Sequence, residues 1–386
     1  MQYLHQSLKN LSRTGGVMDI HDNDTSAEKS FIKQTGEDFF AIINDPGFKK
    51  TISRTTWAII KKFPIAGDLL EVLSETVAGL ADQERVFRQQ RLVDYIRGVA
   101  QIRRDHLDIQ DEDLLIAIRR VIDDDEAGKA EYYARLTVNM VENNVKQAEK
   151  LHFLTMLSEL TCSQINYALE FYIRDTIPLC GYSDIDSAVG ELVNKNDGRS
   201  LRARSILVSW GILHEVQDGA SGVIYKRTED LNKLVSFLFH EMDRQPNAIG
   251  KDQKLAFDVI IVDCMKSTEN LYCTYLHKRL EEAGLRVDIV ERVSDHQLQK
   301  IAKRYVWNNK LVEMSGGHKE YIQIVTLDTP PSVGSPQSES LRQFRLEIDK
   351  FNSNFSRGSN ISKSKAELMK ILDKVAVSLM ESLKNN

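Results

Sequence analysis

The side chains best placed for chemistry are Asp263 and Cys264, a carboxylate and a thiol that directly follow the apolar run Phe257–Val262. A cysteine between a buried strand and a helix lies near backbone amides and the helix dipole, which lower a thiol pKa. The pattern resembles the phosphatase arrangement of a cysteine followed by an arginine, but Asn270 occupies the arginine's position. Asp263 stands where doubly wound folds place phosphoacceptor and metal-binding aspartates. These two residues are the catalytic candidates, and a buried, inert thiol is the alternative interpretation of Cys264.

Other signatures of enzymes are missing from the sequence. It has no G-x-G-x-x-G and no G-x-x-x-x-G-K-[ST] motif, so the usual phosphate cradles are absent. Its nine histidines show no H-E-x-x-H spacing. The carboxylate runs at 111–113 and 123–125 match neither a calcium loop nor an E-x-x-H site. The macrodipole favours acidic residues at helix starts, which explains most of them. The sequence therefore predicts no cofactor and no metal.

A first cluster of basic residues points to nucleic acid. Two short helical patterns, a hairpin pattern and a closing helix follow one another within residues 177–245, which is the layout of a winged helix-turn-helix. In such a unit the helix before the hairpin contacts the nucleic acid, and arginines on one face of it reach phosphates or guanine edges. The candidate residues are Lys195, Arg199, Arg202, Arg204, Lys226 and Arg227. Packing or dimerisation is the alternative role of such a unit.

A second basic cluster lies on the helix predicted at 295–306 and just beyond it. It consists of Lys300, Lys303 and Arg304, with the ring of Trp307 beside them. Basic side chains next to stacking rings suit single-stranded nucleic acid. A solvated helix face is the alternative interpretation.

These residues depend on an α/β region that begins at Phe257. A buried strand is followed by a helix that ends at Gly284, and Leu285–Val290 gives a second strand. A capping box at Ser294 and Gln297 then predicts a second helix. This βαβα order predicts a small parallel or mixed sheet with right-handed crossovers.

The rest of the C-terminal part is predicted from weaker patterns. Leu311–Met314 and Tyr321–Leu327 are expected to be strands, and Leu341–Phe351 is expected to form a short helix. An apolar stripe between Leu368 and Leu383 predicts a terminal helix. That helix either folds back on the α/β domain or pairs with a second subunit.

The fold class is therefore multidomain and mainly α, with a helical bundle, a winged-helix-like unit and a C-terminal α/β domain. The predicted segments are an N-terminal flexible arm (1–30), an all-helical domain (31–176), a winged-helix-like unit (177–245), a linker (246–255), the α/β domain (256–328), a flexible linker rich in Pro, Ser and Asn (329–364) and an amphipathic helix (365–386).

Composition limits the location and the partners. A net charge of −5 over 386 residues gives no global attraction to nucleic acid, so any such contact needs a local patch. Four cysteines without C-x-x-C spacing suggest reduced thiols. Neither a signal peptide nor a run of about 18 apolar residues is visible, so we expect a cytoplasmic protein without a membrane span.

Two parts of the chain are similar to known families. The segments KKFPIAGDLLEVLSE, EYYARLTVNMVENN, EKLHFLTMLSELT, LVSWGIL and YKRTEDLNKLVSFL follow one another over roughly 47–242. In this order they resemble the abortive-infection alpha (Abi-alpha) family of bacterial defence proteins. The segment LHKRLEEAGLRVDIVERVSDHQLQKIAKRY, within 256–328, is similar to the anticodon-binding domain of class II aminoacyl-tRNA synthetases. A TIR-type, NAD-cleaving domain is a further possibility there, but the predicted helix 295–306 lacks the expected glutamate.

The resemblance to Abi-alpha and the basic clusters together favour a bacterial antiviral defence or regulatory factor. Such a factor would bind nucleic acid or a phage component without a catalytic centre of its own. One alternative is an effector enzyme whose α/β domain cleaves a nucleotide or NAD. Another is a protein-protein assembly module that forms a homo-oligomer through the C-terminal helix.

Overall fold

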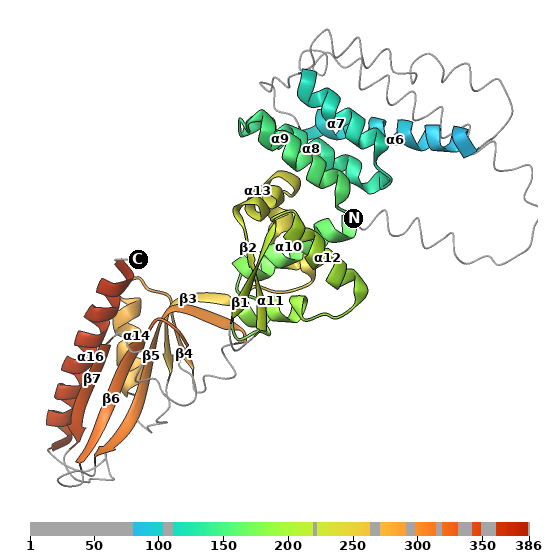
Figure 1. Ribbon diagram of the computed structural model, residues 1–386. Coiled ribbons are helices and arrows are strands. Elements are labelled where there is room, and N and C mark those ends of the chain that lie inside the picture. Colours follow the sequence, from blue (N-terminus) through green and yellow to red (C-terminus); the bar gives the residue numbers. More distant parts are fainter. Residues whose placement is uncertain are drawn as a thin grey trace, which may run out of the picture. The chain divides into compact units, whose positions relative to one another are not determined.

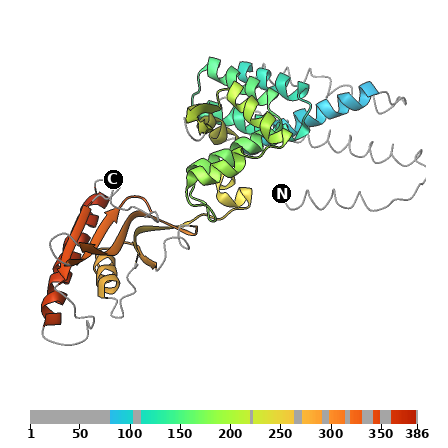
Figure 2. The same ribbon diagram turned by 60° about the horizontal axis from the view of Figure 1, so that its bottom comes forward.

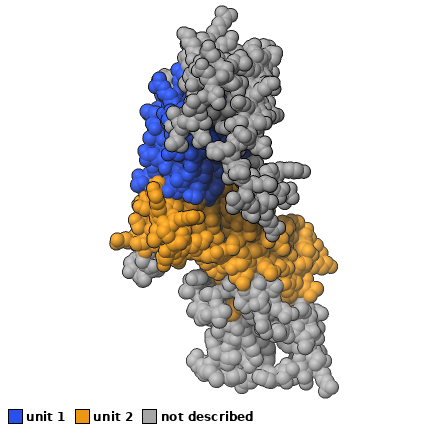
Figure 3. Space-filling view, turned by 90° about the vertical axis from the view of Figure 1, so that its right-hand side faces the viewer, with its two compact units in different colours: residues 1–166, 209–211, 229–240 blue, residues 167–208, 212–228, 241–386 orange. Residues whose placement is uncertain are grey.

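The computed structural model describes residues 80–102, 111–218, 222–262, 271–290, 298–313, 319–330, 342–348 and 360–384. Contacts divide these residues into two units (Figure 3). The first takes its described residues from 80–166, 209–211 and 229–240, and the second takes the others. The chain is mainly helical with a C-terminal sheet of five strands, which confirms the predicted class at that level. Among the described helices, none is long and apolar enough to cross a membrane.

The first unit is a helical bundle, labelled in Figure 1. It comprises α6 (Leu80–Ile102), α7 (Asp111–Asp123), α8 (Ala130–Glu142), α9 (Gln147–Glu159), the start of α10 (Cys162–Thr176), and α13 (Glu229–Leu238). Tyr95, Tyr133 and Phe153 are among its largest fully buried side chains. Gly98 allows α6 to approach α8 closely, because a Cβ at this position would lie 2.7 Å from the Cβ of Ala134. A larger residue at 98 would force these two helices apart.

Helix α13 packs with this bundle, although the order of patterns in 177–245 predicts that it closes the unit of the hairpin. Asn139 and Arg135 of α8 donate hydrogen bonds to the carbonyls of Phe237 (2.7 Å) and Leu238 (3.1 Å). The last carbonyls of a helix have no partner within it, so these two side chains supply the missing donors. The rings of Phe153 and Phe237 also meet edge to face, with 5.4 Å between centroids. The contacts thus group α13 with the bundle, whereas the hairpin belongs to the second unit.

The second unit begins with two helices and a hairpin. Helix α11 (Ile185–Val193) and helix α12 (Gly198–Ser209) precede β1 (Leu213–Asp218) and β2 (Gly222–Arg227). The two strands pair antiparallel, with Leu213 opposite Arg227 and Asp218 opposite Gly222. The two helices and the hairpin therefore form where their local sequence signals placed them.

The five-stranded sheet follows in the order β4-β3-β5-β6-β7 (Figures 1 and 2). Its strands are β3 (Leu255–Val262), β4 (Val287–Val290), β5 (Lys300–Glu313), β6 (Lys319–Leu327) and β7 (Arg342–Ile348). Strand β3 pairs parallel with β4 and β5, whereas β5, β6 and β7 pair antiparallel, so the sheet is mixed. Helices α14 (Leu271–Glu281) and α16 (Asn360–Lys384) cover one face through a shared apolar core.

Two predicted helices are strands. The segment expected to be helical at 295–306 enters β5 at Lys300, and the short helix expected at 341–351 is β7. Leu298, Ile301 and Tyr305 fit a helical stripe, but β5 is held by ladders to β3 on one side and to β6 on the other. Pairing with distant strands overrode the local spacing. The capping box at Ser294 and Gln297 lies outside the described residues.

Both predicted linkers contain regular structure. In 246–255, the 3-10 helix η4 (Pro246–Ile249) is followed by the first residue of β3. Lys254 is buried there and donates to the carbonyl of Ser183 (3.0 Å). In 329–364, β7 forms an edge of the sheet and α16 already begins at Asn360.

The predicted terminal helix is confirmed as α16, and its apolar stripe folds back on its own chain. Leu368, Leu372, Val375 and Leu379 are buried with residues of α14, β3, β5 and β6. The exposed side of this helix is largely charged, with Glu367, Lys370, Lys374 and Glu381. The stripe is thus not available for the homo-oligomer that the sequence left open.

Candidate nucleic-acid interface

Helix α12 is set in place by signals at both of its ends. At its start, the carboxylate of Asp197 accepts hydrogen bonds from the backbone N–H groups of Arg199 (3.1 Å) and Ser200 (3.0 Å). An N-cap of this kind satisfies backbone donors that the helix cannot pair. At its end, Gly211 adopts a positive φ of 68°, which glycine tolerates without a Cβ clash. The chain then turns directly into β1.

Two arginines, Arg174 and Arg227, connect the elements next to α12 through contacts within the chain. Arg174 of α10 is buried and donates to the hydroxyl of Tyr182 (3.0 Å) and to the carbonyl of Ala188 in α11 (2.8 Å). Arg227 at the end of the hairpin forms an ion pair with Asp175 of α10 (2.9 Å). The sequence predicts that Arg227 contacts nucleic acid, but in the structure its ion pair with Asp175 holds the end of the hairpin.

Arg204 is also part of the framework, contrary to the prediction. It is only 6% exposed, donates from Nη1 to the carbonyl of Lys195 (3.0 Å), and lies over the ring of Tyr225 at 5.9 Å. An α-helix turns by about 100° per residue, so Arg204 is about 200° from Arg202 around the axis. The expectation that three arginines share one face was therefore wrong.

The remaining basic residues of the first cluster stay on the surface. Arg199 and Arg202 are exposed on α12, and Lys226 is exposed on β2. Within the described part of the chain, none of these three side chains has a carboxylate within 4 Å. Lys195 is exposed too, but it lies 3.9 Å from Glu170. Two arginines and a lysine are thus left with unshared charges around α12 and the hairpin.

The second basic cluster is occupied by contacts within its own chain. Lys300 binds Asp288 (2.6 Å) and Lys303 binds Asp258 (2.9 Å). Arg304 is buried, and its Nη2 donates to the carbonyl of Ser382 in α16 (3.3 Å). The half-buried ring of Trp307 packs against the apolar core on the sheet's other face. The expected basic-aromatic surface at these residues does not form.

The catalytic candidates Asp263 and Cys264 lie outside the described residues. Another thiol, Cys162 at the start of α10, is a poor nucleophile, because burial and the neighbouring carboxylate of Glu126 raise its pKa to about 12. Among the described residues, no group of three or more His, Cys, Asp or Glu could hold a metal ion. The predicted site residues that the structure describes are therefore those of the two basic clusters.

Comparison with protein-family models, curated proteins and solved structures finds no match to this chain. The helices α11 and α12 and the strands β1 and β2 are called the helix–hairpin region below.

Proposed function

We propose that this protein binds nucleic acid through the helix–hairpin region, in the manner of a winged helix. The single observation that supports the proposal is the exposure of Arg199, Arg202 and Lys226 without carboxylate partners in the described chain. Arginine and lysine side chains in this state neutralise phosphates and release counterions. Arg199 and Arg202 are three positions apart, so they project from neighbouring parts of one helix face.

The wider role that we propose is that of a bacterial defence or regulatory factor that senses a nucleic acid or a phage component. Its support is the resemblance of the sequence over roughly 47–242 to the Abi-alpha family. The position of α12 directly before the hairpin supports the winged-helix interpretation. The effector-enzyme alternative has its candidate residues outside the described chain, so no described geometry favours it.

The test is the salt dependence of binding. We would replace Arg199, Arg202 and Lys226 with alanine and titrate a 20-base-pair DNA duplex or a single-stranded RNA of equal length by fluorescence anisotropy at several salt concentrations. Each phosphate contact contributes about 0.9 to the slope of log K against log salt for duplex DNA. The triple variant should therefore bind more weakly and lose about two to three units of slope.

A matched control removes the same charge elsewhere. Lys278 of α14 and Lys370 and Lys374 of α16 are exposed. Their replacement with alanine changes the net charge equally, but it should leave the slope near that of the parent. An equal loss in both triple variants would mean that general charge, and not the helix–hairpin region, attracts the nucleic acid. Unchanged binding in the first variant would make the region structural.

A further inference from the structure

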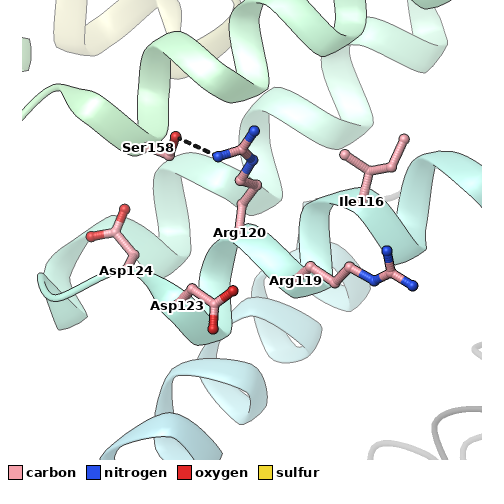
Figure 4. A pocket seen from close by; sticks show the side chains of 6 residues that line it. All are labelled: Ile116, Arg119, Arg120, Asp123, Asp124 and Ser158. Atoms are coloured by element: carbon pink, nitrogen blue, oxygen red, sulfur yellow. Dashed lines mark hydrogen bonds between the residues drawn. The ribbon is translucent and has the colours of Figure 1, made fainter.

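The helical unit contains a pocket that has no part in the proposed nucleic-acid interface. It has a volume of about 500 Å³ and is lined by Ile116, Arg119, Arg120, Asp123, Asp124 and Ser158 (Figure 4). Pockets for small molecules typically measure about 300–1,000 Å³. Its residues come from α7, from the turn after it and from α9, so no local sequence motif marks it.

Arg120 is the unusual residue of this pocket. Figure 4 shows its side chain directed toward Ser158. Its guanidinium donates to the hydroxyls of Ser158 and Thr155, both at 3.3 Å. No carboxylate lies within 4 Å of it among the described residues, and the same holds for Arg119, which is exposed. Two neutral hydroxyls hold Arg120 in position but leave its charge uncompensated.

Of the two aspartates that line the pocket, Asp124 already has cationic and hydroxyl partners of its own. Asp124 is buried and accepts hydrogen bonds from Lys129 Nζ (2.8 Å) and from the Tyr133 hydroxyl (2.8 Å). The lining has two arginines and two aspartates, and Lys129 brings the group to one net positive charge. Asp123 is exposed at the pocket, and no hydrogen-bond donor is paired with it among the described residues, so it can accept hydrogen bonds.

We propose that this pocket binds a small polyhydroxylated ligand that carries a phosphate or a carboxylate group. The oxyanion would lie against the guanidinium of Arg120, whose planar fork matches both kinds of group, and Arg119 would strengthen the local positive field. Hydroxyl groups of the ligand would donate to Asp123. The site does not depend on the proposed nucleic-acid function.

Isothermal titration calorimetry of the full chain tests the proposal with two matched pairs of probes. Ribose 5-phosphate is compared with ribose, and gluconate is compared with glucose. Binding of a charged probe without its neutral counterpart supports an oxyanion site, and the probe that binds identifies phosphate or carboxylate as the group. If neither charged probe binds, or if the neutral sugars bind equally well, the proposal is overturned.

Variants connect any binding to the pocket. Arg120→Gln should weaken binding by about tenfold or more, as expected for a lost hydrogen bond to a charged group. Arg120→Lys should retain part of the affinity, and Arg119→Gln, at an exposed position, should weaken binding without affecting folding. Arg88→Gln removes an exposed arginine that does not line the pocket and should bind as the parent does.

Two further results separate the possible outcomes. Unchanged affinity in both Arg119→Gln and Arg120→Gln would overturn the assignment to this pocket. The Arg199, Arg202 and Lys226 variant should bind the small probe normally, so a failure of the nucleic-acid proposal and a failure of this one are distinguishable.

Discussion

Two regions of this protein carry similar basic sequences but use them differently. In the helix–hairpin region, Arg199 and Arg202 remain exposed and without carboxylate partners among the described residues. In β5, Lys300 and Lys303 each form an ion pair, and Arg304 is buried against α16. The difference does not lie in the number of basic residues, but in what the fold places beside each one.

This contrast shows what makes a basic cluster available to an anionic partner. A charge that already has a carboxylate neighbour gains little when it meets a phosphate, because one contact replaces another. A buried guanidinium with carbonyl partners cannot move without leaving those polar groups unsatisfied. An exposed charge without such partners can neutralise a phosphate at no cost in existing contacts, and this releases counterions from the nucleic acid. By this criterion the helix–hairpin region fits the proposed role of a binding surface, whereas the basic residues of β5 stabilise the sheet and its contact with α16.

The largest expected effect comes from the core that holds β5 and α16 together. Leu372 of α16 is fully buried against α14 and the sheet. Leu372→Ala should lower the free energy of unfolding by about 2–5 kcal/mol, the usual cost of lost burial plus a cavity. Urea denaturation measures this loss. Val377→Ala on the same helix, at a 46% exposed side chain, should change stability by less than about 0.5 kcal/mol. Equal effects of the two variants would contradict the packing of α16.

Within α12, Arg204 is expected to stabilise the fold, whereas Arg202 is expected to bind nucleic acid. Arg204→Ala should lower the free energy of unfolding by about 1.5–3 kcal/mol, since its hydrogen bond to the carbonyl of Lys195 is lost. The salt slope of nucleic-acid binding should stay that of the parent, because a buried guanidinium contacts no phosphate. A lower slope in the folded variant would show that Arg204 reaches the ligand after all.

Arg202 should behave in the opposite way. Arg202→Ala removes an exposed side chain without a carboxylate partner in the described chain, so stability should change by less than about 0.5 kcal/mol. Its salt slope should fall by about 0.9, the contribution of one phosphate contact to duplex DNA. For this variant and for Arg204→Ala, urea denaturation measures the free energy of unfolding and anisotropy titrations measure the salt slope. If both variants change only stability, the helix–hairpin region binds no nucleic acid.

The sequence was sufficient where local chemistry determines the structure. Helices α11 and α12 begin after the capping residues Asp184 and Asp197, and α12 is followed by Gly211 at positive φ. These signals act within a few residues, so they could be identified without the fold. The apolar stripe of α16 was likewise evident from its spacing.

The sequence was insufficient where distant segments meet. Tyr305 fits a helical stripe as well as a strand, and only the ladders from β5 to β3 and β6 decide between them. Arg204 looks equivalent to Arg202 in sequence, and its burial depends on Tyr225 and on the carbonyl of Lys195. The pocket around Arg120 also depends on a distant segment, because the hydroxyls that accept hydrogen bonds from Arg120 belong to α9.

The smallest expected effect is at the Lys303–Asp258 ion pair on the sheet. The side chain of Lys303 is 68% exposed and its ammonium lies 2.9 Å from Asp258. Lys303→Ala should therefore lower the free energy of unfolding at pH 7 by only about 0.2–1 kcal/mol, and 1 M salt should reduce the difference further. The hydrogen bond from Lys303, followed by that from the Arg286 backbone N–H, holds the pKa of Asp258 below its ordinary value.

The pH dependence of this pair follows from the direction of that shift. A carboxyl whose pKa is lower in the folded chain stabilises the fold above its unfolded pKa of about 3.9, and this stabilisation is lost as pH falls through the folded value. The difference in stability between the parent and Lys303→Ala should thus be present at pH 7 and disappear under strong acid. Lys370→Ala, on an exposed lysine of α16 that has no carboxylate within 4 Å among the described residues, is the control for general charge. A difference that persists after Asp258 is protonated would mean that the methylene groups of Lys303 contribute by packing, and β5 would then hold its basic residues by more than ion pairing.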